Sequence, residues 1–301
     1  MAIHPCSSVV DEKGRELVVH GTVSFPIAWY DDDLLNNPVP WHWHEELEAG
    51  YVTEGSIEVA IGAEKRVLRP GDGFFINAEV LHGAWSACSA SCKLNSFVFH
   101  PRLVGGSLDS IYWQNYVSPL ISDRCFEGYF FILDSGNAQI LSYIKSTWEL
   151  CESKQPGYEF EVRAMLSRII FLLAQRGAES PSAPSDKAFR DSTRIKLMLQ
   201  FIHDHYSEEL TIDQIAANAS ISTSEALRCF KSAIGTTPIQ YVKQYRIQKA
   251  AEMLTSTNLK IAEIGALCGF QEMSYFAKSF RELKGMTPAA FRASTSLFLR
   301  Y

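Results

Sequence analysis

Histidine and carboxylate side chains are concentrated in one short segment that reads Trp-His-Trp-His-Glu-Glu-Leu-Glu. Side chains alternate along an extended strand, so His42, His44, Glu46 and Glu48 are expected on one face. A further histidine, His82, lies farther along the chain. Imidazole and carboxylate groups together suit zinc, manganese, iron or nickel. The same groups can instead hydrogen-bond one another and line a pocket for a polar molecule, and the residue types alone leave both interpretations open.

The spacing of these residues resembles the two motifs of the cupin β-barrel family. The order His-x-His-x3-Glu-x6-Gly matches the first motif, and Gly71-x5-Asn77 followed by His82 matches the second. The second motif departs from the family at Asn77 and Glu79, where Pro and Gly are usual. We therefore expect no required cofactor and keep a divalent metal ion as one hypothesis. The resemblance implies four ligand positions for such an ion, which are His42, His44, Glu48 and His82.

Aromatic residues flank the histidines and suggest a ligand class. Aromatic faces beside polar groups suit sugars and other polar ring compounds, because C–H faces stack while hydroxyl groups find hydrogen-bond partners. The same tryptophans can equally belong to a core or an interface. We predict a pocket for a small-molecule effector, with a carbohydrate as one candidate, lined by Trp29, His42, His44, Glu48 and His82.

The chain changes its hydrophobic period along its length. Short apolar runs with frequent turn signals over residues 18–100 predict an all-β sandwich or barrel, with strands at 57–61, 74–76 and 97–99. Helical periodicity follows and predicts helices over Asn137–Ser153 and Glu159–Arg176. The second of these helices is apolar on more than one stripe, so it is either a core helix or a self-association seam.

An internal repeat follows a segment rich in Pro, Ser and Ala, which predicts a linker over residues 177–189. Ile215-Ala216 recurs as Ile264-Gly265, and Gly-x-Thr-Pro at 235–238 recurs at 285–288. Each copy predicts two helices joined by a short turn, the helix-turn-helix arrangement. A long apolar-striped helix from Pro238 to Leu254 is expected to brace both copies.

The repeat resembles the DNA-binding region of the AraC/XylS family of bacterial transcription regulators. The resemblance rests on GTTPIQYVKQYRI at 235–247, IAEIGALCGFQEMSYFAKSF at 261–280 and the following GMTPAAFR. It implies two recognition helices that enter major-groove segments about one helical turn (~10 bp) apart. Carried over by position, the residues that face DNA are Thr223, Ser224, Leu227, Arg228, Lys231, Met273, Ser274, Tyr275, Lys278 and Arg281.

These positions suggest different contacts with DNA. Arg228 is the strongest candidate for base readout, because a guanidinium can pair with guanine O6 and N7 together. Lys231, Lys278 and Arg281 are expected at phosphates. Two carboxylates also lie near this face, at Glu225 and at Glu272. Each either caps its helix, as Glu225 would three residues after the N-cap Ser222, or accepts a hydrogen bond from cytosine N4.

The charge is distributed unevenly along the chain. The net charge of −6 divides into −10 for residues 1–185 and +4 for residues 186–301. The seven cysteines contain no C-x-x-C pair and predict reduced thiols, and Cys88 with Cys92 could supply at most half a metal site. No apolar run is long enough to span a membrane and no signal peptide is recognisable, so we expect a cytoplasmic protein without a membrane partner.

Together these observations predict an α+β multidomain regulator that is not an enzyme. It would bind double-stranded promoter DNA as a homodimer, and would contact RNA polymerase if it is an activator. The alternative is a metal-dependent cupin enzyme fused to a DNA-binding domain. The predicted parts are a cupin-like effector-sensing β-barrel (1–105), a helical dimerisation segment (106–176), the linker (177–189) and an AraC-type double helix-turn-helix domain (190–295).

Overall fold

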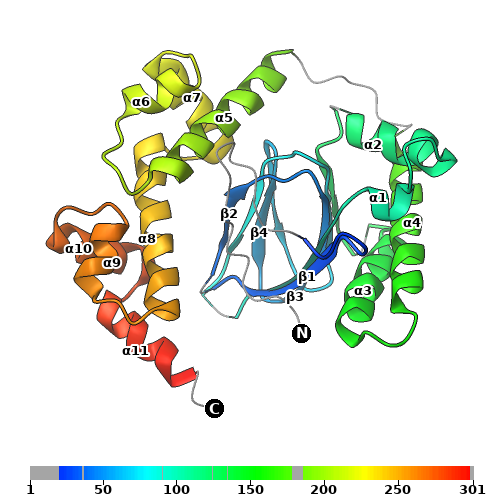
Figure 1. Cartoon of the computed structure of the whole chain (residues 1–301), viewed down its shortest axis with the longest axis horizontal. Coiled ribbons are helices and arrows are strands. Elements are labelled where there is room, and N and C mark those ends of the chain that lie inside the picture. Colours follow the sequence, from blue (N-terminus) through cyan, green and yellow to red (C-terminus); the bar gives the residue numbers. More distant parts are fainter. Residues whose placement is uncertain are drawn as a thin grey trace. The chain divides into compact units, whose positions relative to one another are not determined.

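The computed structural model describes residues 20–35, 37–89, 91–123, 125–133, 135–177 and 186–298. They form two compact units, and the division falls between Ser192 and Thr193. Figure 1 shows that one unit contains β-sheets with helices beside them and that the other is helical throughout. The predicted fold class, a cupin-like β domain with helices followed by an all-α helix-turn-helix domain, is therefore confirmed.

Two antiparallel sheets build the first unit. The five-stranded sheet has the order β1-β8-β3-β6-β9, with β1 (Ile27–Asp33), β8 (Lys93–Phe99), β3 (Leu47–Glu54), β6 (Gly73–Ile76) and β9 (Gly128–Phe131). The four-stranded sheet has the order β2-β7-β4-β5, with β2 (Val39–His42), β7 (His82–Ser86), β4 (Ile57–Ile61) and β5 (Glu64–Leu68). The strands predicted at 57–61, 74–76 and 97–99 are all present, in β4, β6 and β8.

Strand β6 contributes to two hydrophobic cores at once. Phe74 and Ile76 belong to a cluster with residues of both sheets, whereas Phe75 belongs to a cluster shared with the helices. Successive side chains of a strand point to opposite faces, so one strand can serve both cores. Because both faces of β6 are covered, its sequence is a continuous apolar run rather than an alternating one.

Helices α3 (Ala138–Ser153) and α4 (Tyr158–Gly177) pack against one another beside the five-stranded sheet. Their bounds agree with the two predicted helices. The apolar stripe of α4 is core, because its members are buried with α3 and the sheet: Val162, Leu166, Ile169, Ile170 and Leu173. Phe160 and Phe171 of the same helix are exposed. These two residues are therefore the candidates on α4 for a self-association surface.

The segment between the sheets and these helices is less regular than predicted. It contains α1 (Arg102–Gly105), the π-helical turn η1 (Trp113–Val117), α2 (Ser118–Ser122) and then β9, which pairs with β6. The β-sheet structure therefore extends beyond residue 105. Asn77 Nδ2 donates hydrogen bonds of 2.9 Å to the carbonyls of Leu120 and Phe126. The residue that departs from the cupin motif thus ties this segment to the β6–β7 connection.

The second unit begins within α5, at Thr193, and the described residues from α5 onward form helices. They are α5 (Asp186–His205), α6 (Ile212–Asn218), α7 (Thr223–Ile234), α8 (Pro238–Ser256), α9 (Ile261–Leu267), α10 (Met273–Lys284) and α11 (Pro288–Phe298). The predicted long bracing helix is α8. Residues 178–185 of the predicted linker lie outside the described residues, and α5 already begins within the remainder of it. No described helix is both long and apolar enough to cross a membrane.

Candidate functional sites

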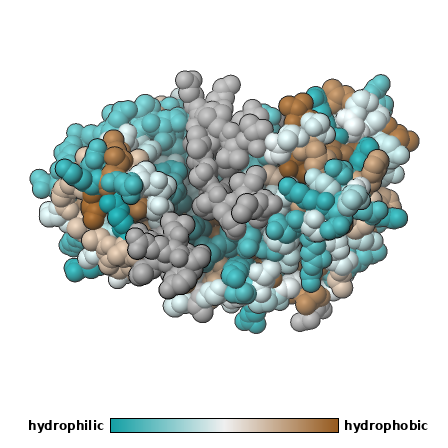
Figure 2. All heavy atoms as spheres, turned by 60° about the horizontal axis from the view of Figure 1, so that its bottom comes forward, coloured by the Kyte–Doolittle hydropathy of each residue, from teal (hydrophilic) through white to brown (hydrophobic). Residues whose placement is uncertain are grey.

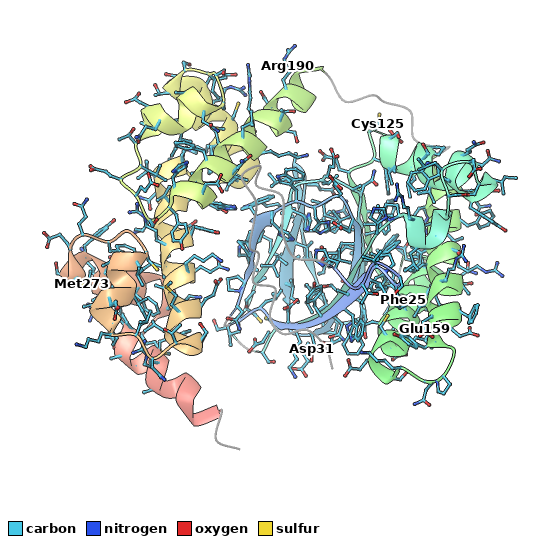
Figure 3. All side chains as sticks on the ribbon, in the orientation of Figure 1. Phe25, Asp31, Cys125, Glu159, Arg190 and Met273 are labelled. Atoms are coloured by element: carbon cyan, nitrogen blue, oxygen red, sulfur yellow. The ribbon has the colours of Figure 1, made fainter. Side chains whose placement is uncertain are left out.

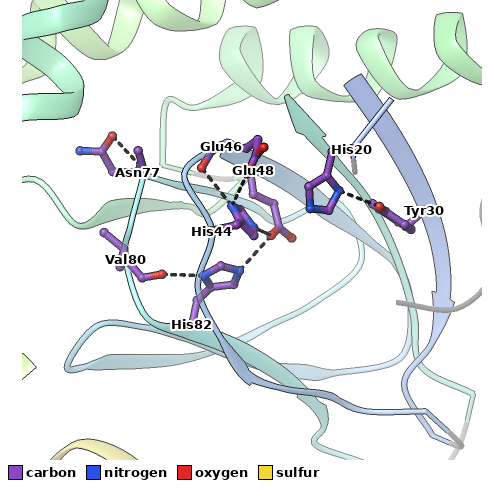
Figure 4. A network of polar contacts seen from close by, with 9 residues as sticks. His20, Tyr30, His44, Glu46, Glu48, Asn77, Val80 and His82 are labelled. Atoms are coloured by element: carbon purple, nitrogen blue, oxygen red, sulfur yellow. Dashed lines mark hydrogen bonds and ion pairs between the residues drawn. The ribbon is translucent and has the colours of Figure 1, made fainter. Parts of the chain in front are cut away.

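The structure brings the four predicted ligand residues together inside the β-sheet unit. His42 ends β2 and pairs directly with His82, the first residue of β7. His44 lies in the connection to β3, and Glu48 is the second residue of that strand. All four are buried, and one donor atom from each lies within 4.8 Å of the others. Figure 4 shows His44 and His82 directed toward the Glu48 carboxylate.

Backbone carbonyl groups fix the orientation of the three imidazoles. The Nδ1 atoms of His42, His44 and His82 lie 2.9, 3.1 and 2.8 Å from carbonyl oxygens. A carbonyl oxygen can only accept, so each Nδ1 carries a proton and donates it. The Nε2 atoms are then left to face other partners, as in metal-binding histidines whose second nitrogen is held by the protein. The three carbonyls belong to Pro40, Glu46 and Val80.

Glu48 meets two of these Nε2 atoms. Its Oε2 lies 3.3 Å from Nε2 of His44 and 3.0 Å from Nε2 of His82. Burial by itself raises the pKa of Glu48, but the contacts with the two histidines outweigh burial and lower it from its ordinary value. An ionised carboxylate and an unprotonated Nε2 are both acceptors. Each contact therefore requires either a second proton on the imidazole or a cation shared between oxygen and nitrogen.

The cavity beside this cluster is small. Its volume is about 20 Å³, and its polar lining includes Tyr30, Asp32, His42, Glu48 and His82. A space of that size holds about one water molecule or one ion. Pockets for organic ligands have volumes of roughly 300 Å³ or more. The cavity as described is therefore much smaller than a site for the carbohydrate that the aromatic residues suggested.

Trp29 does not lie in this cavity, contrary to the prediction. Tyr30 and Asp32 of β1 line it, so the intervening alternation turns Trp29 to the opposite face of the sheet. There its indole Nε1 donates a 2.9 Å hydrogen bond to Glu152, and Lys154 Nζ lies 4.5 Å from the ring centroid. Trp29 therefore joins the sheet to the end of α3.

Three polar residues of the same region were missed by the sequence analysis. Tyr30 and Asp32 line the cavity, and Nδ1 of His20 lies 2.8 Å from the Tyr30 hydroxyl. The His20 ring packs edge-on against His44, with 5.4 Å between centroids. The two-residue period of residues 27–33 could have indicated that Tyr30 and Asp32 share a face. His20 precedes the first strand and carried no such signal.

The two helix-turn-helix copies of the second unit have the same turn. The amide of Ile221 bonds the carbonyl of Ala216 at 3.1 Å, and the amide of Phe270 bonds that of Gly265 at 3.0 Å. The turn residues Ser220 and Gly269 both have left-handed backbones, with φ of 54° and 78°. The copies correspond at an offset of 49 up to Phe270 and of 50 from Glu272 onward. Gln271 is therefore the extra residue of the second copy.

The predicted DNA-facing residues are mostly exposed on α7 and α10. In both helices the side chains that face inward recur at the same spacing, with Phe230 and Phe280 fully buried. The outward face of α7 carries Ser224, Leu227, Arg228 and Lys231, with Thr223 half-buried at its start. The outward face of α10 carries Ser274, Tyr275, Lys278 and Arg281.

Met273 belongs to the scaffold of its own copy. Its side chain is partly buried against the core of the second copy. A Cβ added at Gly265 would lie 2.9 Å from the Met273 methyl carbon, so the two helices approach closely at this point. Figure 3 shows Met273 at the beginning of α10. Its thioether is therefore engaged in packing α9 against α10, unlike the exposed residues that follow it.

Glu225 pairs with arginines and does not use its carboxylate as a cap. Ser222 caps α7 by accepting the amide of Glu225 at 3.3 Å. The Glu225 carboxylate accepts from Arg228 Nη2 at 2.8 Å and Nε at 3.2 Å, and from Arg194 Nη1 at 3.2 Å. At the start of α10, Glu272 makes no side-chain capping bond. Of the two interpretations given for these carboxylates, the structure does not support capping, and no observation tests a contact with cytosine.

Comparisons with known proteins match both units. The model of the AraC-like ligand binding domain matches residues 26–170, and that of the helix-turn-helix domain matches residues 215–294. An uncharacterized HTH-type transcriptional regulator, YdeC of Bacillus subtilis, is 31% identical over 96% of this chain and 99% of its own. The probable transcriptional regulator LumQ of Photobacterium leiognathi is 24% identical over 86% of this chain and 94% of its own.

The comparison with solved structures found similarity to part of this chain. One is an AraC-type DNA-binding domain protein from Chromobacterium violaceum, 28% identical, with a TM-score of 0.33. That match covers 34% of this chain and 91% of the other.

Proposed function

Because the chain belongs to the AraC family of transcription regulators, we propose that α7 and α10 read promoter DNA while the buried cluster binds a divalent metal ion. In this chain a ligand-binding domain precedes a helix-turn-helix domain, and YdeC and LumQ, the relatives matched along most of their length, are named transcriptional regulators. The alternative of a metal-dependent enzyme is therefore set aside. We further propose that the protein acts in the cytoplasm and that, if it is an activator, it contacts RNA polymerase.

The repeated exposed face supports the DNA part of this proposal. Arg228 and Lys278 stand at equivalent positions, as do Lys231 and Arg281. Basic side chains at matching positions on two recognition helices supply phosphate and base contacts in two successive grooves. Selection of binding sites from random duplexes by the whole chain should return two short elements about one helical turn apart. A single element, or no enrichment, would contradict the use of both helices.

The cluster formed by His42, His44, Glu48 and His82 carries the metal part of the proposal. Three Nε2 atoms and one carboxylate oxygen converge beside a cavity that holds about one ion, with each Nδ1 held by a carbonyl. This donor set fits a borderline divalent ion such as Zn²⁺, Mn²⁺, Fe²⁺ or Ni²⁺. When bound, the ion would neutralise Glu48 and replace the second imidazole protons.

Metal analysis tests this site directly. The purified whole chain should retain about one equivalent of a divalent metal after exposure to each of these ions and dialysis. His82→Ala should lose most of that metal, because removing one ligand of four lowers affinity strongly. His205→Ala is the matched control, since His205 is a half-buried histidine of the second unit and lies outside the cluster. Equal metal content in both variants, or none in the wild type, would overturn the metal site.

We also propose that the helical side of the first unit forms a homodimer. Exposed large hydrophobic side chains gather there: Leu108 (56% exposed), Ile111 (63%), Tyr112 (59%), Phe160 (82%) and Phe171 (41%). Figure 2 shows hydrophobic surface at the right of the view, on the side of these helices. The ring centroids of Tyr116 in η1 and Phe171 in α4 are 6.2 Å apart, so the aromatic residues of η1 and of α4 are in contact. Exposed apolar patches of this kind mark interaction surfaces.

Light scattering after gel filtration tests this surface. The wild type should have the mass of two chains, and Tyr112→Glu with Phe171→Glu should shift it toward one chain. Leu197→Glu is the matched control, since Leu197 is an exposed leucine of the second unit. A wild-type monomer both with and without DNA would contradict the dimer.

A further inference from the structure

Two cysteine sulfurs lie against one another where β7 continues into β8. Sγ of Cys88 is 2.9 Å from Sγ of Cys92. A disulfide bond joins two sulfurs at about 2.05 Å, so a short movement would bring them to bonding distance. Neither DNA binding nor the metal cluster uses these two residues.

The two thiols differ in access. Cys88 is partly exposed, whereas Cys92 is fully buried at 0%. A dissolved reagent would therefore meet Cys88 first. Cys92 is positioned as a resolving thiol, which would attack the Cys88 sulfur after Cys88 has reacted with the reagent.

Two polar groups contact the Cys92 sulfur. Its sulfur lies 3.3 Å from the carbonyl oxygen of Ser56, to which the S–H group can donate. The hydroxyl of Ser86 lies 3.1 Å from the same sulfur. The same hydroxyl lies 2.5 Å from the carbonyl oxygen of Cys88, and it has only one hydrogen to donate. A rotation of the hydroxyl would turn that hydrogen from the carbonyl toward a Cys92 thiolate.

We propose that Cys88 and Cys92 form a thiol modification site that reacts with low-molecular-weight disulfides of the glutathione type and closes to an intramolecular disulfide. The proposal is independent of the DNA and metal functions. Cytosolic disulfides are characteristically transient and redox-sensing, which fits a pair formed and broken in this way.

The reaction is a two-step thiol–disulfide exchange. The Cys88 thiolate attacks one sulfur of the small disulfide, whose S–S bond breaks and releases one small thiolate. The Cys92 thiolate then attacks Cys88 Sγ, the mixed disulfide breaks and a second small thiolate leaves. The protein dithiol loses two electrons, which reduce the small disulfide to two thiols. The two protons from Cys88 and Cys92 end on those thiols.

A disulfide bond between Cys88 and Cys92 would constrain the connection between β7 and β8. The connection carrying Cys88 and Cys92 links β7 of one sheet to β8 of the other. The turn between β3 and β4 packs against it, because a Cβ added at Gly55 would lie 2.8 Å from Cys92 Sγ. A bond that closes so short a loop removes little chain entropy. Reduced glutathione should therefore reopen it.

Peptide mass spectrometry of the intact chain tests the site. The protein is incubated with oxidised glutathione, its free thiols are blocked with N-ethylmaleimide, and it is digested with trypsin without reduction. The peptide from Val67 to Lys93 contains both cysteines. It should lose the mass of two hydrogen atoms and carry no maleimide. Reduced glutathione should restore a peptide that takes two maleimides.

Single substitutions separate the roles of the two thiols. Cys92→Ser should leave Cys88 trapped as a mixed disulfide with glutathione, and Cys88→Ser should leave Cys92 largely unmodified. The exposed Cys125, on another peptide of the same digest, reports how far exposed thiols react in each sample. The proposal is overturned if wild-type Val67–Lys93 keeps two maleimides or only accumulates glutathione while Cys125 reacts. This wild-type result decides the matter even if a variant fails to fold.

Discussion

The first and second helix-turn-helix copies share a buried framework and differ on the surface that faces outward. Phe230 and Phe280 are both 0% exposed, and the turn hydrogen bonds correspond residue by residue. On the surface, Arg228 stands where the second copy has Lys278. The carboxylate of Glu225, which holds Arg228, is replaced by the phenol of Tyr275. The two copies therefore share their packing and differ in the chemistry of their outward faces.

Under the proposed DNA-binding function, this difference predicts separate tasks for the two copies. A guanidinium held along one edge by a carboxylate keeps its geometry and can present its remaining donors to one base edge. A lysine ammonium on a flexible stem is a point charge suited to phosphate. We infer that the first copy supplies more of the sequence discrimination and the second more of the general attraction.

The largest expected effects concern the shared framework. Phe230→Ala and Phe280→Ala should each destabilise their own copy by about 3–5 kcal/mol, because each removes a fully buried aromatic ring. Amide hydrogen exchange followed by mass spectrometry should show faster exchange in α7 for the first variant and in α10 for the second. If one copy kept its protection after this substitution, the two frameworks would not be equivalent.

A smaller and asymmetric effect is expected at the DNA face. Arg228→Ala should cost about 1–3 kcal/mol at one base pair of the selected site and relax discrimination there. Lys278→Ala should weaken binding to all sequences alike and reduce the slope of log affinity against log salt by about one. Titration of duplexes with single-base changes at several salt concentrations checks both. Equal loss of discrimination in the two variants would remove the division of tasks.

The local structure of the repeat was predictable because its signals are local. Ser222, expected as an N-cap, accepts the amide three residues ahead, and Thr211 does the same at the start of α6. Gly235 and Gly285 end α7 and α10 in the left-handed conformation, as their sequence positions indicated. Caps, stops and 3.6-residue stripes depend on neighbours within one turn, so one sequence suffices to find them.

The contents of the β-sheet unit depend on contacts between distant residues. Only the family resemblance implied that His82 lies near His42 and Glu48. The side chains of β1 alternate between the two faces of the sheet, so Trp29 and its neighbour Tyr30 point to opposite faces. Strand β9 is a four-residue strand whose partner is more than 50 residues earlier, and no local pattern marks it. The size of the cavity follows from packing of both sheets and could not be read from residue types.

The smallest expected effect separates two ways of starting a helix. Ser222→Ala should destabilise α7 by about 1 kcal/mol, because it removes the hydroxyl that accepts the Glu225 amide. Glu272→Ala should cost only about 0.3 kcal/mol, because Glu272 makes no capping bond and contributes only its charge near the helix N-terminus. Salt screens the second contribution and leaves the first nearly unchanged. The exchange rates of the first-turn amides should be measured at low and high salt. At high salt the rates of Glu272→Ala should approach those of the wild type, whereas the rates of Ser222→Ala should stay different. A salt-dependent Ser222→Ala effect would mean that the first copy, too, depends on charge at this point, and that the copies begin their recognition helices in the same way.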